Sequence, residues 1–175
     1  MDTLLTPRFT LTRLAEHDWP FFLQLRQDSA IMRYMAEIIP EAETRALFEQ
    51  RLQPWAPGAP HPLDFIIRAH GSDTPLGNIG LRHGDEGPHV AEVGYTVAVA
   101  AQGRGIAGEA LQAVCDFAFR QVGIRTLKAV IVAENAASAR VLEKNGFRHV
   151  AVLKASYTLR GQTYDDWVYQ RVRDA

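Results

Sequence analysis

The chain has 175 residues, of which 47% are hydrophobic and 22% charged, and its formal net charge is −1. This composition is typical of one soluble globular domain over residues 1–175, and the near-neutral charge excludes a global attraction to nucleic acid or to anionic membranes. The single cysteine, Cys115, excludes an internal disulfide and a cysteine-cluster metal site, and without a signal-peptide pattern or a membrane-span run we expect a cytoplasmic protein.

The first half of the chain predicts a strand, two helices and then an antiparallel meander. Residues 9–14 alternate as a short strand, and the apolar spacing around Phe22 predicts a helix over residues 17–34, with Pro20 in its first turn. A second amphipathic helix is expected over residues 41–52, before a proline-rich loop. Glycine-containing turns separate three expected strands, which lie at residues 63–69, 75–82 and 90–99.

The second half predicts alternating helices and strands. We expect helices over residues 106–122 and 135–145, with Asn135 as the N-cap and Gly146 after the C-terminus of the second. The expected strands lie at residues 127–132, 147–153 and 164–172. Because a helix crosses over between strands 90–99 and 127–132, this pair is predicted to be parallel. The fold class is therefore α/β (α+β), with one mixed, mostly antiparallel sheet of about seven strands and about four helices.

The most informative segment is the turn over residues 102–107, which joins a strand to a helix through Gly103 and Gly105. Bare backbone N–H groups at the positive end of a helix form a phosphate-binding device. Together with Gly108 and with Glu134 after the next strand, the turn also fits the fingerprint of an NAD-dependent oxidoreductase. The 41 residues after Glu134 are too few for the further parallel units of such a fold, so we do not favour this alternative.

A second pattern fits the turn better. Gln102, Gly105 and Ala107 match the form Gln/Arg-x-x-Gly-x-Gly/Ala, and about 30 residues later comes Asn135-x-x-Ser138-x-Arg140-Val141-Leu142-Glu143-Lys144-x-Gly146-Phe147. Both segments resemble the cofactor motifs of the GNAT N-acetyltransferase superfamily, in the form seen in its RimJ/RimL-like branch. Looser matches occur at residues 7–11, 91–95 and 160–165, so the resemblance covers nearly the whole chain.

The resemblance implies a sheet that splays between the strands flanking the glycine turn, with the pantetheine arm of acetyl-CoA lying in the gap. Backbone amides near Val97 and Ala98 would polarise the thioester carbonyl, and N–H groups of residues 102–107 would bind the diphosphate. For Arg104 and Lys144 a solvated position is an open alternative to a phosphate contact. The residues expected to bind the cofactor are Val97, Ala98, Val99, Gln102, Gly103, Arg104, Gly105, Ile106, Ala107, Asn135, Arg140 and Lys144.

The implied reaction is direct transfer of acetyl from acetyl-CoA to a primary amine, either a protein N-terminal α-amine or a small amine, without a metal. Many superfamily members place an acidic tyrosine seven residues after the asparagine, but this chain has Leu142 there. Ser138 is a candidate proton relay, and Glu92 is the favoured general base, with His83 as a weaker alternative. Cys115 lies within the helix after the glycine turn, so no acyl-cysteine intermediate is expected.

Two questions stay open at this stage. A non-catalytic sensor of acyl-CoA is the main rival to an enzyme, because the tyrosine is missing. The acceptor pocket should draw on residues 32–39, the loop over 54–62 and the hairpin over 157–164, but no motif there names the acceptor. We expect no nucleic-acid or membrane partner, and the oligomeric state is undetermined, a homodimer included.

Overall fold

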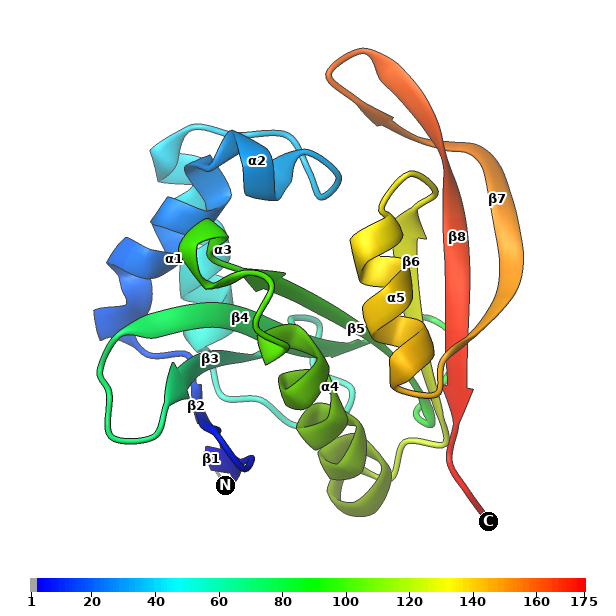
Figure 1. Ribbon diagram of the computed structural model, residues 1–175, viewed down its shortest axis with the longest axis horizontal. Coiled ribbons are helices and arrows are strands. Elements are labelled where there is room, and N and C mark those ends of the chain that lie inside the picture. Colours follow the sequence, from blue (N-terminus) through cyan, green and yellow to red (C-terminus); the bar gives the residue numbers. More distant parts are fainter. Residues whose placement is uncertain (1–2) are drawn as a thin grey trace.

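The computed structural model describes residues 3–175, whose strands form one eight-stranded sheet (Figure 1). The strands follow the order β1-β2-β3-β4-β5-β6-β8-β7 across the sheet. All neighbouring pairs are antiparallel except β5 and β6, which are parallel, as the helical crossover predicts. The bounds are β1 Thr3–Leu5, β2 Phe9–Arg13, β3 Leu63–Ala69, β4 Pro75–His83, β5 Val90–Val97, β6 Thr126–Val132, β7 Arg148–Leu159 and β8 Gln162–Val172.

The parallel pair opens into a V. Only three residue pairs join the two strands, from Val90↔Thr126 to Glu92↔Lys128. Beyond Glu92, β5 continues along β4 to Val97, while β6 continues along β8 to Val132. Figure 1 shows the two strands diverging from a common end. The splayed sheet that the sequence resemblance implied is therefore present, between the strands that flank the glycine turn.

Helices cover both faces of the sheet. One face carries α1, α2 and α3, and Phe22 of α1 packs on Phe48 of α3 with ring centroids 5.2 Å apart. The other face carries α4, whose buried residues recur at helical spacing from Ile106 to Phe117 and form most of the core with the inner sides of the strands. The helix bounds are α1 Trp19–Gln27, α2 Ser29–Met32, α3 Glu41–Leu52, α4 Ile106–Phe117 and α5 Ala136–Lys144.

Several predicted boundaries were wrong. The helix expected over 17–34 is interrupted at Asp28, whose carboxylate accepts hydrogen bonds from Ala30 N–H and Ile31 N–H and so starts α2 as a new helix. The strand expected to reach Val99 ends at Val97, because residues 99–101 form a 3₁₀ helix. The final hairpin is longer than expected, and β1 adds an eighth strand.

No helix within residues 3–175 combines the length and the apolar content needed to cross a membrane.

Candidate functional site

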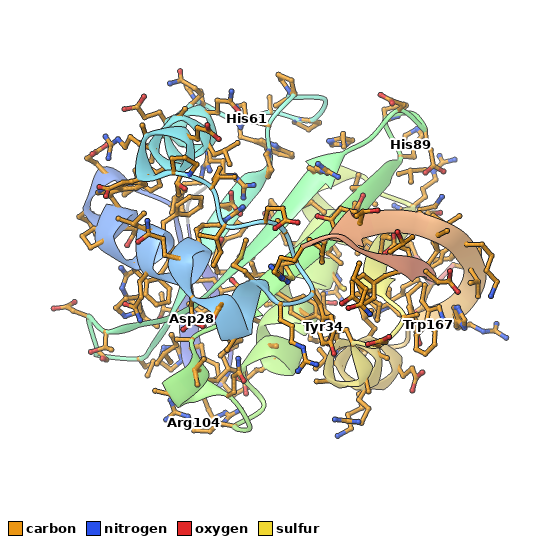
Figure 2. The ribbon with its side chains drawn as sticks, turned by 90° about the horizontal axis from the view of Figure 1, so that it is seen from above. Asp28, Tyr34, His61, His89, Arg104 and Trp167 are labelled. Carbon is orange, nitrogen blue, oxygen red and sulfur yellow. The ribbon has the colours of Figure 1, made fainter. Side chains whose placement is uncertain are left out.

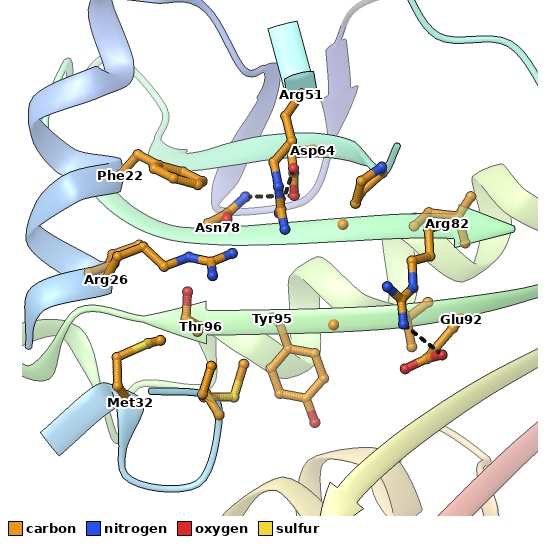
Figure 3. Close-up of a pocket in the computed structure, with 18 residues that line it drawn as sticks. Phe22, Arg26, Met32, Arg51, Asp64, Asn78, Arg82, Glu92, Tyr95 and Thr96 are labelled. Atoms are coloured by element: carbon orange, nitrogen blue, oxygen red, sulfur yellow. Dashed lines mark hydrogen bonds and ion pairs between the residues drawn. The ribbon is translucent and has the colours of Figure 1, made fainter. Parts of the chain in front are cut away.

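Two cavities meet at the opening between β5 and β6. The first, which we call the loop cavity, has a volume of about 550 Å³ and lies between the glycine turn, the diverging end of β5 and the start of α5. The second, the strand cavity, has a volume of about 300 Å³ and lies between α1 and the middle of β4 and β5 (Figure 3). Both volumes are typical of small-molecule sites.

The loop cavity contains the uncapped N-terminus of α4. Gly105 is the N-cap with φ of 74°, in the left-handed region that glycine adopts without strain, and no side chain caps the helix. The first intrahelical bond is Glu109 N–H to Gly105 O at 3.2 Å. The N–H groups of Ile106, Ala107 and Gly108 thus have no intrahelical acceptor, and these residues line the cavity. The positive end of the α4 dipole and the free N–H donors both favour an anion at this place.

One face of α5 adds positive charge to the same cavity. Arg140 and Lys144 stand four residues apart, line the cavity, and form no ion pair with any of residues 3–175. Asn135 also lines the cavity, but its side-chain oxygen accepts the Ser138 N–H at 3.3 Å and so caps α5. The cavity therefore offers helix N–H groups on one side and two unpaired cations on the other, an arrangement that fits a polyphosphate.

The free edge of β5 also faces the opening. Ala98 N–H donates to Leu76 O at 2.9 Å, so this amide belongs to the β4–β5 ladder. Since antiparallel residues alternate in the direction of their backbone groups, the N–H groups of Tyr95 and Val97 point away from β4, into the V. Of the two amides predicted to polarise a carbonyl, the Val97 N–H faces the V and the Ala98 N–H is bonded to β4. Gln102 supports this edge, because its side-chain amide donates to Val97 O at 3.0 Å.

The strand cavity is lined by the opposite face of the sheet. Alternate residues of three strands form its floor, where the cross-strand pair Gly80↔Gly94 leaves the backbone uncovered. A Cβ added at Gly80 would come within 2.5 Å of the Asp64 carboxylate, whereas one at Gly94 would meet no atom within 4 Å. Glycine at position 80 therefore makes room for Asp64, and glycine at position 94 leaves free space above the sheet.

The carboxylates of the strand cavity already have partners. Asp64 is buried and pairs with Arg51 at 2.9 Å, and Asn78 donates to its other oxygen at 3.2 Å. Glu92 pairs with Arg82, which lies opposite it on β4, at 3.5 Å. Because the Glu92 side chain is 37% exposed and its ion pair is long, this carboxylate is the one that can exchange protons with a ligand.

The two cavities share Met35, Tyr95 and Thr96. Tyr95 points from β5 across the V, and its hydroxyl donates to Ser138 O on α5 at 3.3 Å. Burial raises the pKa of Tyr95 to about 12, against a smaller lowering effect of this hydrogen bond. The junction thus holds a phenol that stays protonated at physiological pH and that joins the two sides of the opening.

Replacing Tyr95 by phenylalanine tests whether this phenol acts as an acid. We expect kcat to fall by roughly 3- to 30-fold, because Ser138 O loses its donor and the junction loses its fixed width. Because a group with a pKa near 12 does not titrate between pH 6 and 10, the shape of the rate profile over that range should be unchanged. A basic limb that disappears in the variant would show instead that Tyr95 gives up its proton during turnover.

The hairpin of β7 and β8 closes the opening from the far side. Its Tyr157 hydroxyl donates to Met35 O at 2.9 Å, and the Arg160 guanidinium donates to Met32 O at 3.3 Å and to Arg33 O. The Arg160 N–H also donates to the Glu37 carboxylate. These bonds hold the segment after α2 against the hairpin tip, and so place Met35 between the two cavities.

The structure gathers most of the predicted cofactor residues around the loop cavity. Ala98, Val99 and Arg104 do not line it: Val99 is exposed in the 3₁₀ helix, and Arg104 lies at the periphery of the molecule (Figure 2). The Gln102 N–H is also unavailable, because it donates to Val99 O at 3.2 Å. The predicted residues that line the loop cavity are Val97, Gln102, Gly103, Gly105, Ile106, Ala107, Asn135, Ser138, Arg140 and Lys144.

The candidate proton carriers do not share one cavity. Glu92 lines the strand cavity and Ser138 the loop cavity, on opposite sides of the junction. His83 lines neither cavity: it stacks on Trp55, and its Nδ1 accepts the Gly58 N–H at 3.2 Å. His83 thus lies outside both cavities, with its ring held in a structural contact. Within residues 3–175, no group of three or more His, Cys, Asp or Glu side chains is arranged to hold a metal ion.

The sequence did not indicate the residues at the junction of the two cavities, or Arg26 in the strand cavity. Tyr95 and Thr96 follow the Glu92-Val93-Gly94 segment directly, so strand alternation around Glu92 could have pointed to Tyr95 on the opposite face. Arg26 of α1 lines the strand cavity from above, but nothing in an amphipathic helix pattern marks it. Of the segments expected to form the acceptor pocket, residues 32–36 contribute three side chains, the loop over 54–62 contributes Pro62, and the hairpin acts through its bonds to the backbone.

The chain matches known proteins over nearly its whole length. A family model described as an acetyltransferase (GNAT) domain matches residues 8–148. The "Uncharacterized N-acetyltransferase p20" of Bacillus licheniformis is 24% identical over 99% of this chain and 97% of its own. The crystal structure of spermidine N-acetyltransferase from Vibrio cholerae in complex with CoA and spermine has a TM-score of 0.82 at 19% identity, covering 94% of this chain and 95% of that one. RimL, a ribosomal L7/L12 α-N-protein acetyltransferase in complex with CoA, has a TM-score of 0.81 at 21% identity, covering 98% of both chains.

Proposed function

The chain belongs to the GNAT acetyltransferase family, and from this premise we propose that it transfers acetyl directly from acetyl-CoA to a primary amine in a ternary complex. The observation that carries the proposal is the meeting of two cavities at the V between β5 and β6. One cavity has the donors for a diphosphate, and the other has a carboxylate that can take a proton. Residues 1–175 then act as one catalytic domain.

On the cofactor side, the loop cavity would hold CoA. N–H groups of Ile106, Ala107 and Gly108 bind the diphosphate, and Arg140 and Lys144 meet further phosphate charge. Each bond from an N–H group to a charged oxygen contributes about 1.5–3 kcal/mol. The pantetheine arm lies along the free edge of β5, where the backbone groups of Tyr95 and Val97 pair with it as a neighbouring strand would.

On the acceptor side, the amine enters through the strand cavity and loses a proton to Glu92, directly or through water. Its nitrogen then attacks the thioester carbonyl at the junction, the Val97 N–H stabilises the oxyanion, and the C–S bond breaks. As the C–S bond breaks, the second proton of the amine passes to the departing sulfur by way of the Ser138 hydroxyl, on the loop-cavity side. Leu142, where other members have tyrosine, is fully buried and supplies no hydroxyl.

The choice of amine depends on the cost of deprotonation. A lysine side chain has a pKa of about 10.4 and a protein α-amine about 7.7–8.0, so at pH 7.5 the free lysine amine costs about 4 kcal/mol and the α-amine well under 1. One partly exposed carboxylate in an ion pair is a modest base. This favours an acceptor of low amine pKa, either a protein N-terminus or a small molecule.

The test is release of CoA and a mass gain of one acetyl group, measured on a panel of N-terminal peptides, amino acids, polyamines and aminoglycosides. We expect acetylation of at least one class, with the rate dependent on both substrates at once. Tight binding of acetyl-CoA without faster thiol release for any acceptor would instead support the sensor alternative. An NAD-dependent oxidoreductase would bind NAD(H) and not CoA.

Direct transfer also makes a prediction about Cys115. This thiol is fully buried in α4, and burial raises its pKa to about 11, so it is neither reachable nor nucleophilic at neutral pH. Replacing Cys115 by alanine should leave kcat within about twofold, at a cost of roughly 1–2 kcal/mol in stability from the lost packing. Mass spectrometry of the enzyme mixed with acetyl-CoA alone should show no acetylated protein; a covalent adduct at Cys115 would contradict the direct route.

A further inference from the structure

We propose that the amine acceptor also carries an anionic oxygen group, a carboxylate or a phosphorus oxyanion of similar shape, which the guanidinium of Arg26 binds. The inference rests on the acetyl-transfer function above, because it takes the strand cavity as the acceptor side. It names the substrate class as compact amino acids and related amine–acids, and excludes polyamines.

The first observation is that Arg26 has no ionic partner. It lies in the last turn of α1, and its side chain extends into the strand cavity between Asn78 of β4 and Thr96 of β5 (Figure 3). Its guanidinium packs over the Phe22 ring, 5.1 Å from the centroid. Within residues 3–175, no hydrogen bond or ion pair reaches this guanidinium.

The second observation is that the unpaired charge of Arg26 lowers the stability of the fold. Burial, together with the nearby charge of Arg51, lowers the pKa of Arg26 to about 10, with Asp64 acting in the opposite direction. The group is still a cation at neutral pH. Arg26 is partly buried, and a charge withdrawn from water without a counterion destabilises the fold, so a residue of this kind is better explained by an anion that arrives with the ligand.

The third observation is that the rest of the cavity cannot accept a polycation. Three arginines line it against two carboxylates, and both carboxylates are engaged, Asp64 by Arg51 and Glu92 by Arg82. A ligand carboxylate would find the planar fork of Arg26 free for a paired contact. A ligand with positive charge alone would meet Arg26 without compensation.

Position and volume limit the size of the acceptor. Thr96 belongs to both cavities and lies beside Arg26, so an anion on Arg26 is close to the junction where the amine must react. Glu92 stands four residues back along β5, about 13 Å away at the rise of a strand, so the proton of an amine at the junction reaches Glu92 through water in the strand cavity. A cavity of about 300 Å³ at this place suits a molecule whose amine and acid are a few bonds apart.

The experiment compares matched acceptors at saturating acetyl-CoA. Each amino acid is tested beside its carboxamide, which removes the carboxylate charge and also lowers the amine pKa, and beside its aminoalkylphosphonate, with spermidine as the polycation. Rates are compared at equal concentrations of the unprotonated amine, so that the difference in amine pKa does not enter the comparison. We expect kcat/KM for the acids to exceed that for the amides by at least about tenfold. In Arg26→Gln, kcat/KM for the acids should fall roughly 10- to 100-fold, mainly through KM, while that for the amides changes by less than about threefold.

Controls separate a binding role from a structural one. Arg26→Lys keeps the charge but not the fork, so it should lie between wild type and Arg26→Gln. Arg120 is an exposed residue of the π-helical turn Ala118–Val122, and Arg120→Gln should behave as wild type. The melting temperature of free Arg26→Gln should stay or rise by about 2–4 °C, because an unpaired, partly buried charge is removed. A fall in melting temperature with equal losses for acids and amides would show a structural role and overturn the proposal.

Two other results would also overturn it: acids no better than amides with the wild type, or an acid preference that survives in Arg26→Gln. If no amine is acetylated, calorimetry with the same acids and amides in the presence of CoA still decides the matter. Acid-specific binding that disappears in Arg26→Gln would support the anion site while the transfer function fails; absence of that binding would refute the site. Comparing each amino acid with its aminoalkylphosphonate distinguishes a site for carboxylates from a site for phosphorus oxyanions.

Discussion

Replacing Gly105 by aspartate is expected to raise the KM for acetyl-CoA by at least about 100-fold without lowering the melting temperature. Aspartate tolerates the left-handed φ of 74° at this position and is a good N-cap for α4. Its Cβ would lie 3.3 Å from an amino group of Arg8, close enough for the carboxylate to pair with that guanidinium. The same carboxylate would occupy the free N–H groups and repel a diphosphate by about 4 kcal/mol at 4 Å.

Two variants isolate the cause of this effect. Gly105→Asn has the same shape without the charge, so its KM should rise much less. Gly123→Asp has a similar φ, 85°, at the other end of the helical segment, with no atom near its added Cβ, so it should bind acetyl-CoA as the wild type does. Calorimetric affinity of Gly105→Asp within threefold of wild type would show that the cofactor phosphates lie elsewhere.

Replacing Glu92 by glutamine is expected to lower kcat about 10²- to 10⁴-fold at pH 7 while leaving the KM for acetyl-CoA unchanged. Glutamine keeps the size of the side chain and an oxygen that can accept a hydrogen bond from Arg82, whose guanidinium lies 3.5 Å from the Glu92 carboxylate in the wild-type protein. It cannot take a proton from the ammonium form of the acceptor, which is the step assigned to a general base. The measurement is a pair of pH–rate profiles with the same amine.

The deficit of Glu92→Gln should shrink as the pH approaches the pKa of the amine, because more acceptor then arrives already deprotonated. The control is Glu86→Gln, which removes an exposed carboxylate paired with Lys128 at 2.6 Å, outside both cavities. Glu86→Gln should leave both kcat and the KM for acetyl-CoA unchanged. A loss in Glu92→Gln that is equal at every pH would assign Glu92 a role in holding Arg82 rather than in proton transfer.

The sequence predicted those parts of the fold that depend on local spacing. The bounds of α3 and β3, the cap at Asn135 and the turn at Arg160-Gly161 agree with the structure, because caps, glycines and apolar periodicity determine them within a few residues. The break at Asp28 was missed because its capping role depends on backbone geometry that an apolar pattern does not report. Which amides of β5 face the V depends on the register of β5 on β4, and a strand pattern in the sequence does not report that register.

The site could be predicted on its cofactor side and not on its acceptor side. The proposed phosphate site uses a contiguous turn and one helix face, so Gly105, Arg140 and Lys144 can be recognised from spacing. Arg26 and Met35 come from α1 and the segment after α2, Tyr95 comes from β5, and the three meet only in the folded chain. Moreover, the property that singles out Arg26 is the lack of a partner, and no sequence pattern records whether a charge is paired.

Pairing between β5 and β6 stops after Glu92 and Lys128, which leaves the sheet with an edge in its interior. Beyond that point the two sides of the protein are linked chiefly by side chains, among them Tyr95 to Ser138 and the hairpin tip to the segment after α2. Amide hydrogens on this inner edge should exchange faster with solvent in the free protein than those of β3 and β4, and slow down when an extended ligand adds its own backbone to the row.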